Sequence, residues 1–267
     1  MSRIASTFAG LRGRRPALIG FVTAGFPDGK TCLRLALALV EHCDILEIGI
    51  PFSDPVMDGP VLQETAHLAL ENGFRLEHAL LTLEALRRSS EKPLLFMTYY
   101  NPVFRRGAER FAAEAREAGA DGVLVADLPP EEGDEWAEAA RMNGLDRVLF
   151  ASPTTPDERL DRIDALGSGF LYCISTLGTT GPRERLDEGL GAYVERVRSR
   201  VRLPLALGIG ITTPQHCREA GGLADGVIVG SHFMRSCLEA LRRGEDPEPA
   251  LRRAAAEMRL ALESPGP

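Results

Sequence analysis

The sequence has 267 residues, a length that allows one large hydrophobic core or two modest domains. Charged residues make up 26% and apolar residues 44% of it, as is ordinary for a globular protein in water. The net charge of −7 argues against sequence-independent binding to nucleic acid or to an anionic membrane, and no apolar run approaches the ~20 residues of a membrane span.

The first predicted element is a short amphipathic helix within the stretch MSRIASTFAGLRGRR. Ile4, Phe8 and Leu11 recur at helical spacing and share one face. The stretch lacks the apolar core and the small-residue cleavage site of a signal peptide. The five cysteines are scattered without a CxxC pair, which is typical of a reducing compartment, so we expect no metal site.

Eight short runs rich in Val, Ile and Leu follow, separated by helical patterns that often end at Gly or Asn. The runs cover residues 17–25, 44–51, 93–99, 121–127, 147–152, 169–175, 203–210 and 225–230. They are almost continuously apolar, as are parallel strands that are buried on both faces. A strand joined to the next through a helix implies parallel pairing with right-handed crossovers.

Eight strand–helix units in a chain of this length predict an α/β fold, a single (β/α)8 TIM barrel with an additional N-terminal helix. A doubly wound sheet is the competing fold, but TAGFPDG after the first strand is not the glycine-rich dinucleotide turn that such a sheet usually carries. From Arg242 onward the pattern predicts a loop, one more helix and a frayed end. We therefore expect residues 1–267 to form one domain.

Two carboxylates lie in the stretch LEIGIPFSDPVMDGPVLQ, residues 46–63. On a strand, Ile45, Glu47 and Gly49 share one face, so Glu47 points into the barrel mouth if the aliphatic face meets the helices. Desolvation there would raise its pKa and suit it to proton transfer near neutral pH. Asp58 follows in a proline-rich loop, and two carboxylates in unlike surroundings suit a division of acid and base roles. A structural ion pair for Glu47 and a loop cap for Asp58 are the alternative.

Glycine-rich turns end the last three predicted strands: STLGTTG at 175–181, GIG at 208–210 and VGS at 229–231. Glycines let backbone N–H groups approach a phosphate closely, and a helix N-terminus favours its charge. Ser231 adds a hydroxyl at an expected N-cap. In barrels of this kind a phosphate site after strands seven and eight recurs, so these turns predict one.

The remaining polar and aromatic residues at strand ends are less specific. Asp127 could be catalytic, structural or a partner contact, and Tyr99, Tyr100 and Asn101 could line an aromatic pocket. The five histidines show no metal-ligand spacing.

Taken together, these motifs resemble the signature of the tryptophan synthase alpha subunit family. The similarity extends from about residue 3 to residue 262 and is carried by FVTAGFP (21–27), LEIGIPFSDPVMDGPVLQ (46–63), MTYYNPV (97–103), DGVLVADLP (121–129), GIGITTPQ (208–215) and ADGVIVGS (224–231). The resemblance implies a (β/α)8 barrel that cleaves indole-3-glycerol phosphate by a retro-aldol reaction to indole and glyceraldehyde 3-phosphate. It also implies that Glu47 is the general acid/base and that Asp58 accepts a hydrogen bond from the indole N–H.

The resemblance further assigns the substrate-binding residues. Backbone groups at the glycines and the Ser231 hydroxyl would hold the phosphate, Phe21 and Tyr172 would border the indole, and Thr180 would help to close the site. The glycines concerned are Gly181, Gly208, Gly210 and Gly230.

The family members act with a beta subunit that carries pyridoxal phosphate, in an alpha2beta2 heterotetramer. The resemblance therefore implies a cytoplasmic enzyme of tryptophan biosynthesis whose own chain needs no cofactor or metal. In that family the loops 54–58 and 175–181 communicate between the subunits.

The chain departs from the family pattern at Met57, Thr179 and His232, which concern the partner and the efficiency more than the reaction. A stand-alone indole-3-glycerol-phosphate lyase that releases free indole is the main alternative. An allosteric binding subunit with little chemistry of its own would not need Glu47 and Asp58. A Schiff-base aldolase needs a buried lysine, and we expect both lysines, Lys30 and Lys92, at helix or loop edges.

Overall fold

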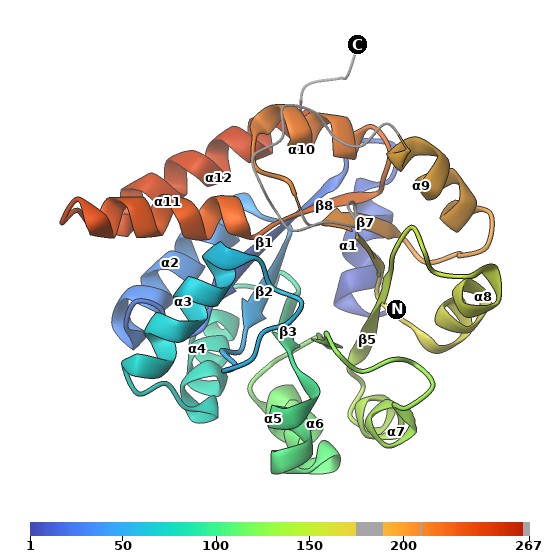
Figure 1. Cartoon of the computed structure of the whole chain (residues 1–267), viewed down its shortest axis with the longest axis horizontal. Coiled ribbons are helices and arrows are strands. Elements are labelled where there is room, and N and C mark those ends of the chain that lie inside the picture. The colour runs from blue at the N-terminus through green and yellow to red at the C-terminus, as the bar shows by residue number, and fades with distance from the viewer. Residues whose placement is uncertain (175–188, 209, 264–267) are drawn as a thin grey trace.

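The computed structural model describes residues 1–174, 189–208 and 210–263, and in it eight parallel strands close into a barrel in chain order, β1 to β8. Figure 1 shows the helices arranged around this barrel. The strands are β1 (Ala17–Thr23), β2 (Ile45–Gly49), β3 (Leu94–Thr98), β4 (Gly122–Val125), β5 (Asp146–Ala151), β6 (Leu171–Ile174), β7 (Leu205–Gly208) and β8 (Gly226–Val229). The predicted fold class is confirmed.

Every connection between consecutive strands contains at least one helix among the described residues, and the helix between β6 and β7 is α9. Two helices occupy the connection after β2 and again the one after β3. They are α1 (Arg3–Leu11), α2 (Gly29–His42), α3 (Pro60–Glu71), α4 (Leu76–Ser89), α5 (Tyr100–Arg106), α6 (Ala108–Glu117), α7 (Asp134–Met142), α8 (Asp157–Leu166), α9 (Leu190–Arg198), α10 (Pro214–Gly221), α11 (Ser231–Arg242) and α12 (Pro247–Glu263).

Alternation along the strands separates two layers of the core. In β2, Ile45 belongs to the cluster inside the barrel, whereas Leu46 and Ile48 belong to the cluster between the barrel and the helices. Both faces are therefore buried, which explains why the strand sequences are almost continuously apolar. The assignment of Ile45 and Glu47 to the inner face of β2 follows from this alternation and is confirmed.

Helix α1 closes the end of the barrel where the strands begin. Ile4 and Phe8 are buried in the inner cluster, Leu11 packs against it, and the Phe8 ring lies 5.7 Å from that of Phe170. Ser2 caps the helix by accepting a hydrogen bond from the Ala5 N–H at 3.2 Å. The other end of the barrel, where the strands finish, is thus the open one.

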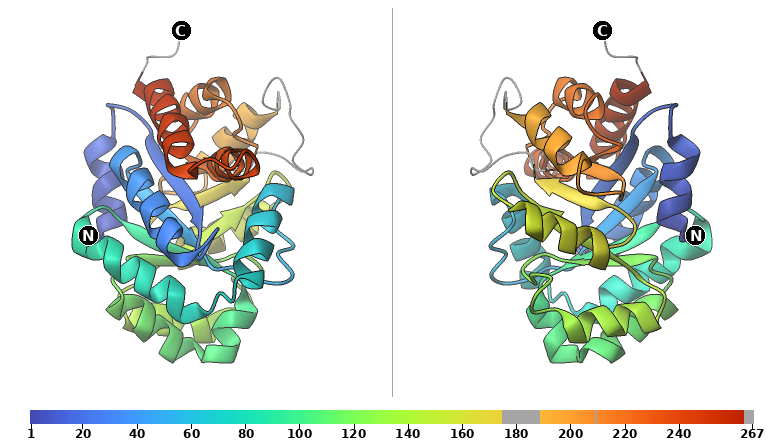
Figure 2. Two further views of the ribbon diagram at one scale, coloured as in Figure 1. Left: turned by 90° about the vertical axis from the view of Figure 1, so that its left-hand side faces the viewer. Right: turned by 90° about the vertical axis from the view of Figure 1, so that its right-hand side faces the viewer.

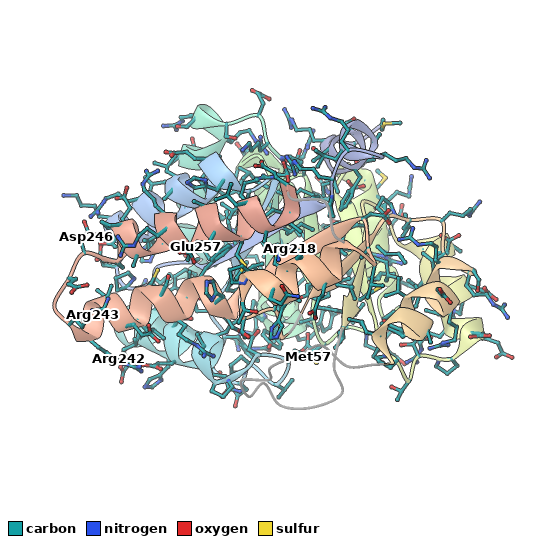
Figure 3. The ribbon with its side chains drawn as sticks, turned by 90° about the horizontal axis from the view of Figure 1, so that it is seen from above. Met57, Arg218, Arg242, Arg243, Asp246 and Glu257 are labelled. Atoms are coloured by element: carbon teal, nitrogen blue, oxygen red, sulfur yellow. The ribbon has the colours of Figure 1, made fainter. Side chains whose placement is uncertain are left out.

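Helices α11 and α12 run side by side along the outside of β1, and Figure 2 shows the pair from two directions. Figure 3 shows Arg242, Arg243 and Asp246 gathered at the connection between the two helices. Arg242 also donates a hydrogen bond to Glu64 of α3 at 2.6 Å, so this corner is joined to the helix that follows β2.

The start of β2 is joined to α12 by a largely buried carboxylate, Asp44. Asp44 accepts hydrogen bonds from Arg15 at 2.7 and 2.9 Å, from Arg259 at 3.0 Å and from the Leu18 N–H at 2.8 Å. Burial alone would raise the pKa of Asp44, but these donors lower it to about 2.

Within the described part of the chain, no helix combines the length and the apolar character that crossing a membrane requires. All five cysteines are free thiols in buried positions.

Candidate active site

A cavity of about 620 Å³ opens at the end of the barrel where the strands finish. Parallel strands bring all their carboxyl ends to this one edge, so side chains that are distant in sequence meet here. The residues predicted for the site that line it are Phe21, Glu47, Asp58, Tyr172, Gly210, Gly230 and Ser231. Thr180 and Gly181, and with them Thr179, lie outside the described residues.

Glu47 is the most buried carboxylate of this cavity, with only 1% of its surface exposed. It lies on β2 opposite Phe21 of β1, and its Oε1 has no hydrogen-bond partner among the described residues. No arginine, lysine or histidine of that part of the chain forms an ion pair with it. Burial raises the pKa of Glu47 to about 8, so this carboxyl can hold a proton at neutral pH and release it to a reacting group.

Asp58 belongs to the loop between β2 and α3. Its backbone N–H donates to the Pro55 carbonyl at 3.0 Å and its carbonyl accepts from Gln63 Nε2 at 2.9 Å, so the loop is held at both sides of the carboxylate. Burial raises the pKa of Asp58 to about 6, and a hydrogen bond from Tyr99 opposes the rise. Asp58 is therefore mainly ionised at pH 7, whereas Glu47 is mainly protonated.

Tyr99 has a role that the sequence did not indicate. Its Oη donates to Asp58 Oδ2 at 3.1 Å and accepts the Met57 N–H at 3.1 Å. Its ring is buried and stacks on Phe52, with centroids 5.2 Å apart and planes at 28°. One hydroxyl thus fixes both the backbone and the carboxylate of the loop.

The walls around Glu47 are aromatic and aliphatic. Tyr172 and Phe150 lie with ring centroids 4.6 Å apart, and Met97 and Ile228 complete the apolar surface. Burial, with Glu47 and Asp58 nearby, raises the pKa of Tyr172 well above its ordinary value, so its hydroxyl stays neutral. Sequence patterns gave no indication of Phe150, and Met97 was noted only as the first residue of the motif MTYYNPV.

At two positions only glycine leaves enough space for these aromatic rings. A Cβ on Gly49 would collide with the Phe21 ring, and one on Gly208 would collide with Tyr172. Gly208 itself is not among the residues that line the cavity, so its predicted part in substrate binding stays a prediction. What the structure indicates for Gly208 is that its missing side chain makes room for Tyr172.

The opposite side of the cavity has the features of an anion site. Gly210 adopts a φ of 88°, a conformation that favours glycine, and Gly230 precedes the first residue of α11, Ser231. The N–H groups of the first helical turn have no partners within a helix, and together with the helix dipole they attract negative charge. Next to Ser231, the His232 side chain has a lowered pKa because of burial, and its Nε2 has no partner among the described residues.

Other candidates lie outside the cavity. Asp127, for which three roles were open, accepts a hydrogen bond from the Tyr100 N–H at 2.6 Å at the start of α5. Lys92 donates to three backbone carbonyls, Val40, Glu41 and Cys43, away from the barrel mouth. Within the described part of the chain, no group of three or more His, Cys, Asp or Glu residues could hold a metal ion.

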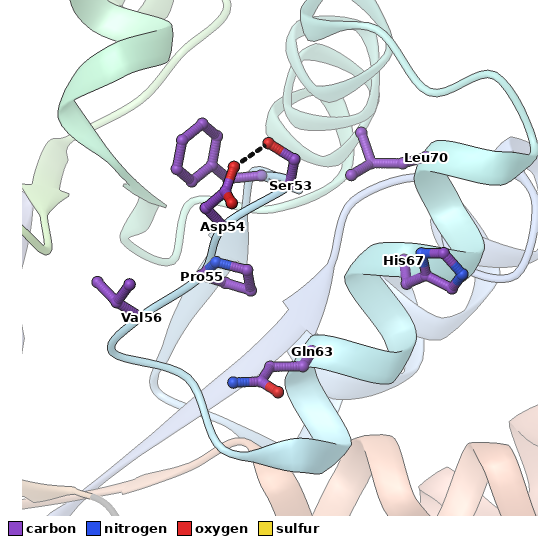
Figure 4. Close-up of a pocket in the computed structure, with 8 residues that line it drawn as sticks. Ser53, Asp54, Pro55, Val56, Gln63, His67 and Leu70 are labelled. Carbon is purple, nitrogen blue, oxygen red and sulfur yellow. Dashed lines mark hydrogen bonds between the residues drawn. The ribbon is translucent and has the colours of Figure 1, made fainter.

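A shallow groove of about 450 Å³ lies on the outer side of the same loop, against α3. Figure 4 shows it between Asp54, Pro55 and Val56 of the loop and Gln63 and His67 of the helix. Val56, which lines both this groove and the larger cavity, is 75% exposed.

A closed (β/α)8 barrel with two carboxyl groups of different pKa, Glu47 and Asp58, at its mouth is typical of an enzyme of the barrel class, and the two groups are suited to acid–base chemistry. The family model described as "Tryptophan synthase alpha chain" matches residues 8–263. The chain belongs to the tryptophan synthase alpha chain family.

Curated relatives extend over nearly the same length. The tryptophan synthase alpha chain of Roseiflexus sp. (strain RS-1) is 50% identical over 234 residues, which cover 86% of this chain and 90% of that one. That of Thermococcus kodakarensis is 45% identical over 245 residues, covering 91% and 95%.

Solved structures are similar along the whole chain. Tryptophan synthase subunit alpha from Legionella pneumophila str. Paris has a TM-score of 0.91 at 34% identity, covering 98% of this chain and 99% of that one. A chain of Mycobacterium tuberculosis tryptophan synthase has a TM-score of 0.90 at 34% identity and 99% coverage of both chains. The alpha chain carries no cofactor of its own, since pyridoxal phosphate belongs to the beta chain.

Proposed function

We propose that Glu47 is the general acid/base and Asp58 the acceptor for the indole N–H in the reaction of this alpha chain, the retro-aldol cleavage of indole-3-glycerol phosphate to indole and glyceraldehyde 3-phosphate in tryptophan biosynthesis. The observation that carries the proposal is a buried carboxyl with an unpartnered oxygen, Glu47, in one cavity with the less buried Asp58. Membership of the alpha chain family supports the reaction itself.

The chemistry follows from the two protonation states. Glu47 gives its proton to indole C3, and the positive charge that develops on the ring is stabilised by ionised Asp58 at the N–H. The Glu47 carboxylate then removes the proton from the hydroxyl of the adjacent side-chain carbon. The O–H electrons form the aldehyde C=O, the carbon–carbon bond breaks, and its electrons restore the neutral indole ring. Glu47 ends protonated, as it began.

The indole and the phosphate of the substrate would occupy different parts of the cavity. The rings of Phe21 and Tyr172 suit the flat indole, and the start of α11 with Gly210, Gly230 and Ser231 suits the phosphate. The parts assigned by resemblance to Thr180 and Gly181 remain part of the proposal.

The cleavage can be tested by measuring the amounts of both products and the deuterium that indole takes up from the solvent. The purified chain incubated with indole-3-glycerol phosphate in D2O should release indole and glyceraldehyde 3-phosphate in equal amounts, with one deuterium at indole C3. Unequal products would contradict the cleavage, and indole without that deuterium would contradict protonation of C3 by an acid that exchanges with solvent, as Glu47 does.

We further propose that the chain works in the cytoplasm with a beta subunit that holds pyridoxal phosphate, as an alpha2beta2 heterotetramer. The similar solved chains come in part from structures of tryptophan synthase, and the groove beside exposed Val56 adjoins the loop that carries Asp58. A partner that contacts this loop would also hold the catalytic carboxylate in place.

The partner proposal predicts that adding a beta subunit raises the rate of indole formation by orders of magnitude. Asp54→Arg, which alters the groove but not the cavity, should weaken this activation and leave the rate of the isolated chain unchanged. Fast release of indole by the isolated chain, unaffected by the partner, would instead indicate the stand-alone lyase.

A further inference from the structure

Among the described residues, three aromatic side chains line the catalytic cavity, and they differ in how much of each ring is exposed. Phe21 is 6% and Tyr172 is 7% exposed, whereas Phe150 is only partly buried. The ring of Phe150 therefore offers more surface to a bound molecule than either of the other two. The resemblance to the family assigns the border of the indole to Phe21 and Tyr172 and gives no role to Phe150.

The two buried rings are packed directly against backbone. A Cβ on Gly230 would come within 3.3 Å of the Phe21 Cβ, and one on Gly49 would collide with the end of the Phe21 ring. The hydroxyl of Tyr172 lies where a Cβ on Gly208 would be. Because a close-packed backbone yields little, these two rings have little room to move away from a ligand.

Phe150 lies near the end of β5 on the inner face, where it packs against the inner cluster. On the β6 side its ring meets that of Tyr172, with centroids 4.6 Å apart and planes at 51°. On the β4 side its neighbour is Ala126, because the register pairs Leu124 with Val148 two residues earlier. Phe150 is thus the bulky, partly exposed side chain of this wall, between a fixed ring and a single methyl group.

The order of the strands indicates which part of the substrate meets Phe150. Glu47 is on β2 and the start of α11 follows β8, and β1 lies between these two strands. In a closed ring of eight strands, β5 is opposite β1. The glycerol phosphate extends from the indole towards α11, so the six-membered ring of the indole points the other way, across the mouth towards β5.

We propose that Phe150 is a specificity-determining residue, whose ring closes the end of the cavity that receives the six-membered ring of the indole and excludes substituents on it. The proposal rests on the roles proposed above for Glu47, Asp58 and the start of α11, since these orient the substrate. A single methyl group in an apolar pocket changes kcat/KM by about 10–200-fold, so such an exclusion is measurable.

The test compares kcat/KM of the full-length chain for indole-3-glycerol phosphate and for its derivatives that carry one methyl group on the six-membered ring. The wild type should cleave at least one derivative about tenfold or more slowly than the parent substrate. Phe150→Val opens the wall and should reduce this difference to about threefold or less, mainly through KM. Phe104→Val makes the same change on α5 at a ring that is 66% exposed and lies outside the cavity, so it should leave the difference unchanged.

Two kinetic results would overturn the proposal: equal cleavage of all derivatives and the parent by the wild type, or an unchanged difference in Phe150→Val. A loss of activity in Phe150→Val that is equal for all substrates would also overturn it, because the ring would then only support the structure of the site.

Binding of indole and of the same methylindoles, measured by calorimetry, gives the size preference without any turnover. If the wild type cleaves none of the substrates, the roles proposed for Glu47 and Asp58 fail. The binding preference of wild type against Phe150→Val still decides whether Phe150 limits the size of the cavity.

Thermal unfolding without ligand checks that each variant folds. If Phe150→Val does not fold, Phe150→Leu decides, since it keeps more apolar volume but still removes the ring. Its preference for the parent substrate should be weaker than that of the wild type, and an unchanged preference would contradict the proposal.

Discussion

Removing the Tyr99 hydroxyl perturbs the candidate site at one atom. Tyr99→Phe keeps the ring that stacks on Phe52 but deletes the donor to Asp58 and the acceptor for the Met57 N–H. Because that hydrogen bond lowers the pKa of Asp58, its loss makes Asp58 a weaker acid.

The size of the effect follows from the geometry. A hydrogen bond to a charged group contributes about 1.5–3 kcal/mol, and we take the lower value because Asp58 is only partly buried. This corresponds to a roughly tenfold smaller ionisation constant. Starting from a pKa of about 6, the ionised fraction of Asp58 falls about twofold at pH 7 and about fivefold at pH 6.

The assay is kcat/KM for indole release between pH 5 and pH 9. The wild-type profile should be bell-shaped, falling below about pH 6 as Asp58 is protonated and above about pH 8 as Glu47 loses its proton. Tyr99→Phe should shift only the acidic limb of the pH profile to higher pH. Tyr100→Phe, which removes a neighbouring hydroxyl outside the cavity, should shift neither limb. A Tyr99→Phe profile that is lowered equally at all pH values would refute the reasoning.

Three further predictions concern packing, phosphate and stability. Gly49→Ala places a Cβ against the Phe21 ring, so it should cost about 1–3 kcal/mol of stability by thermal or urea unfolding and raise KM; an unchanged melting temperature would contradict the packing. Ser231→Ala should raise KM about threefold to tenfold with little change in kcat, as steady-state kinetics would detect, and a change confined to kcat would argue against a binding role. Asp44→Asn should lower the free energy of unfolding by about 2 kcal/mol at pH 6 in urea titrations. Since the folded pKa of Asp44 lies below the unfolded one, this difference is complete above about pH 4 and should disappear as the pH falls towards 2; a difference that persists at pH 2 would contradict the account.

The barrel could be predicted because both faces of each strand are buried. Runs such as 44–51 and 121–127 are apolar without a break, and helices separate them, so parallel pairing followed from the pattern. The observed strands are shorter, with β2 at Ile45–Gly49 and β4 at Gly122–Val125, because pairing stops where each chain turns into its loop.

Contacts that depend on loop conformation could not be predicted. The hydrogen bond from Tyr99 to Asp58 joins residues 41 positions apart and exists only when the loop after β2 folds over the end of β3. The close approach of Gly208 to Tyr172 likewise depends on the register of β6 and β7, and the predicted part of Gly208 in substrate binding stays a prediction.

The most direct test of the central claim is the steady-state release of indole from indole-3-glycerol phosphate by Glu47→Gln, compared with wild type and with Glu64→Gln. The control makes the same chemical change on α3 at a carboxylate that pairs with Arg242 outside the cavity. Glu47→Gln keeps the shape of the site but cannot transfer a proton, so its rate should fall by about 100-fold or more while substrate binding persists. Wild-type turnover by Glu47→Gln would contradict the assignment of proton transfer to this residue.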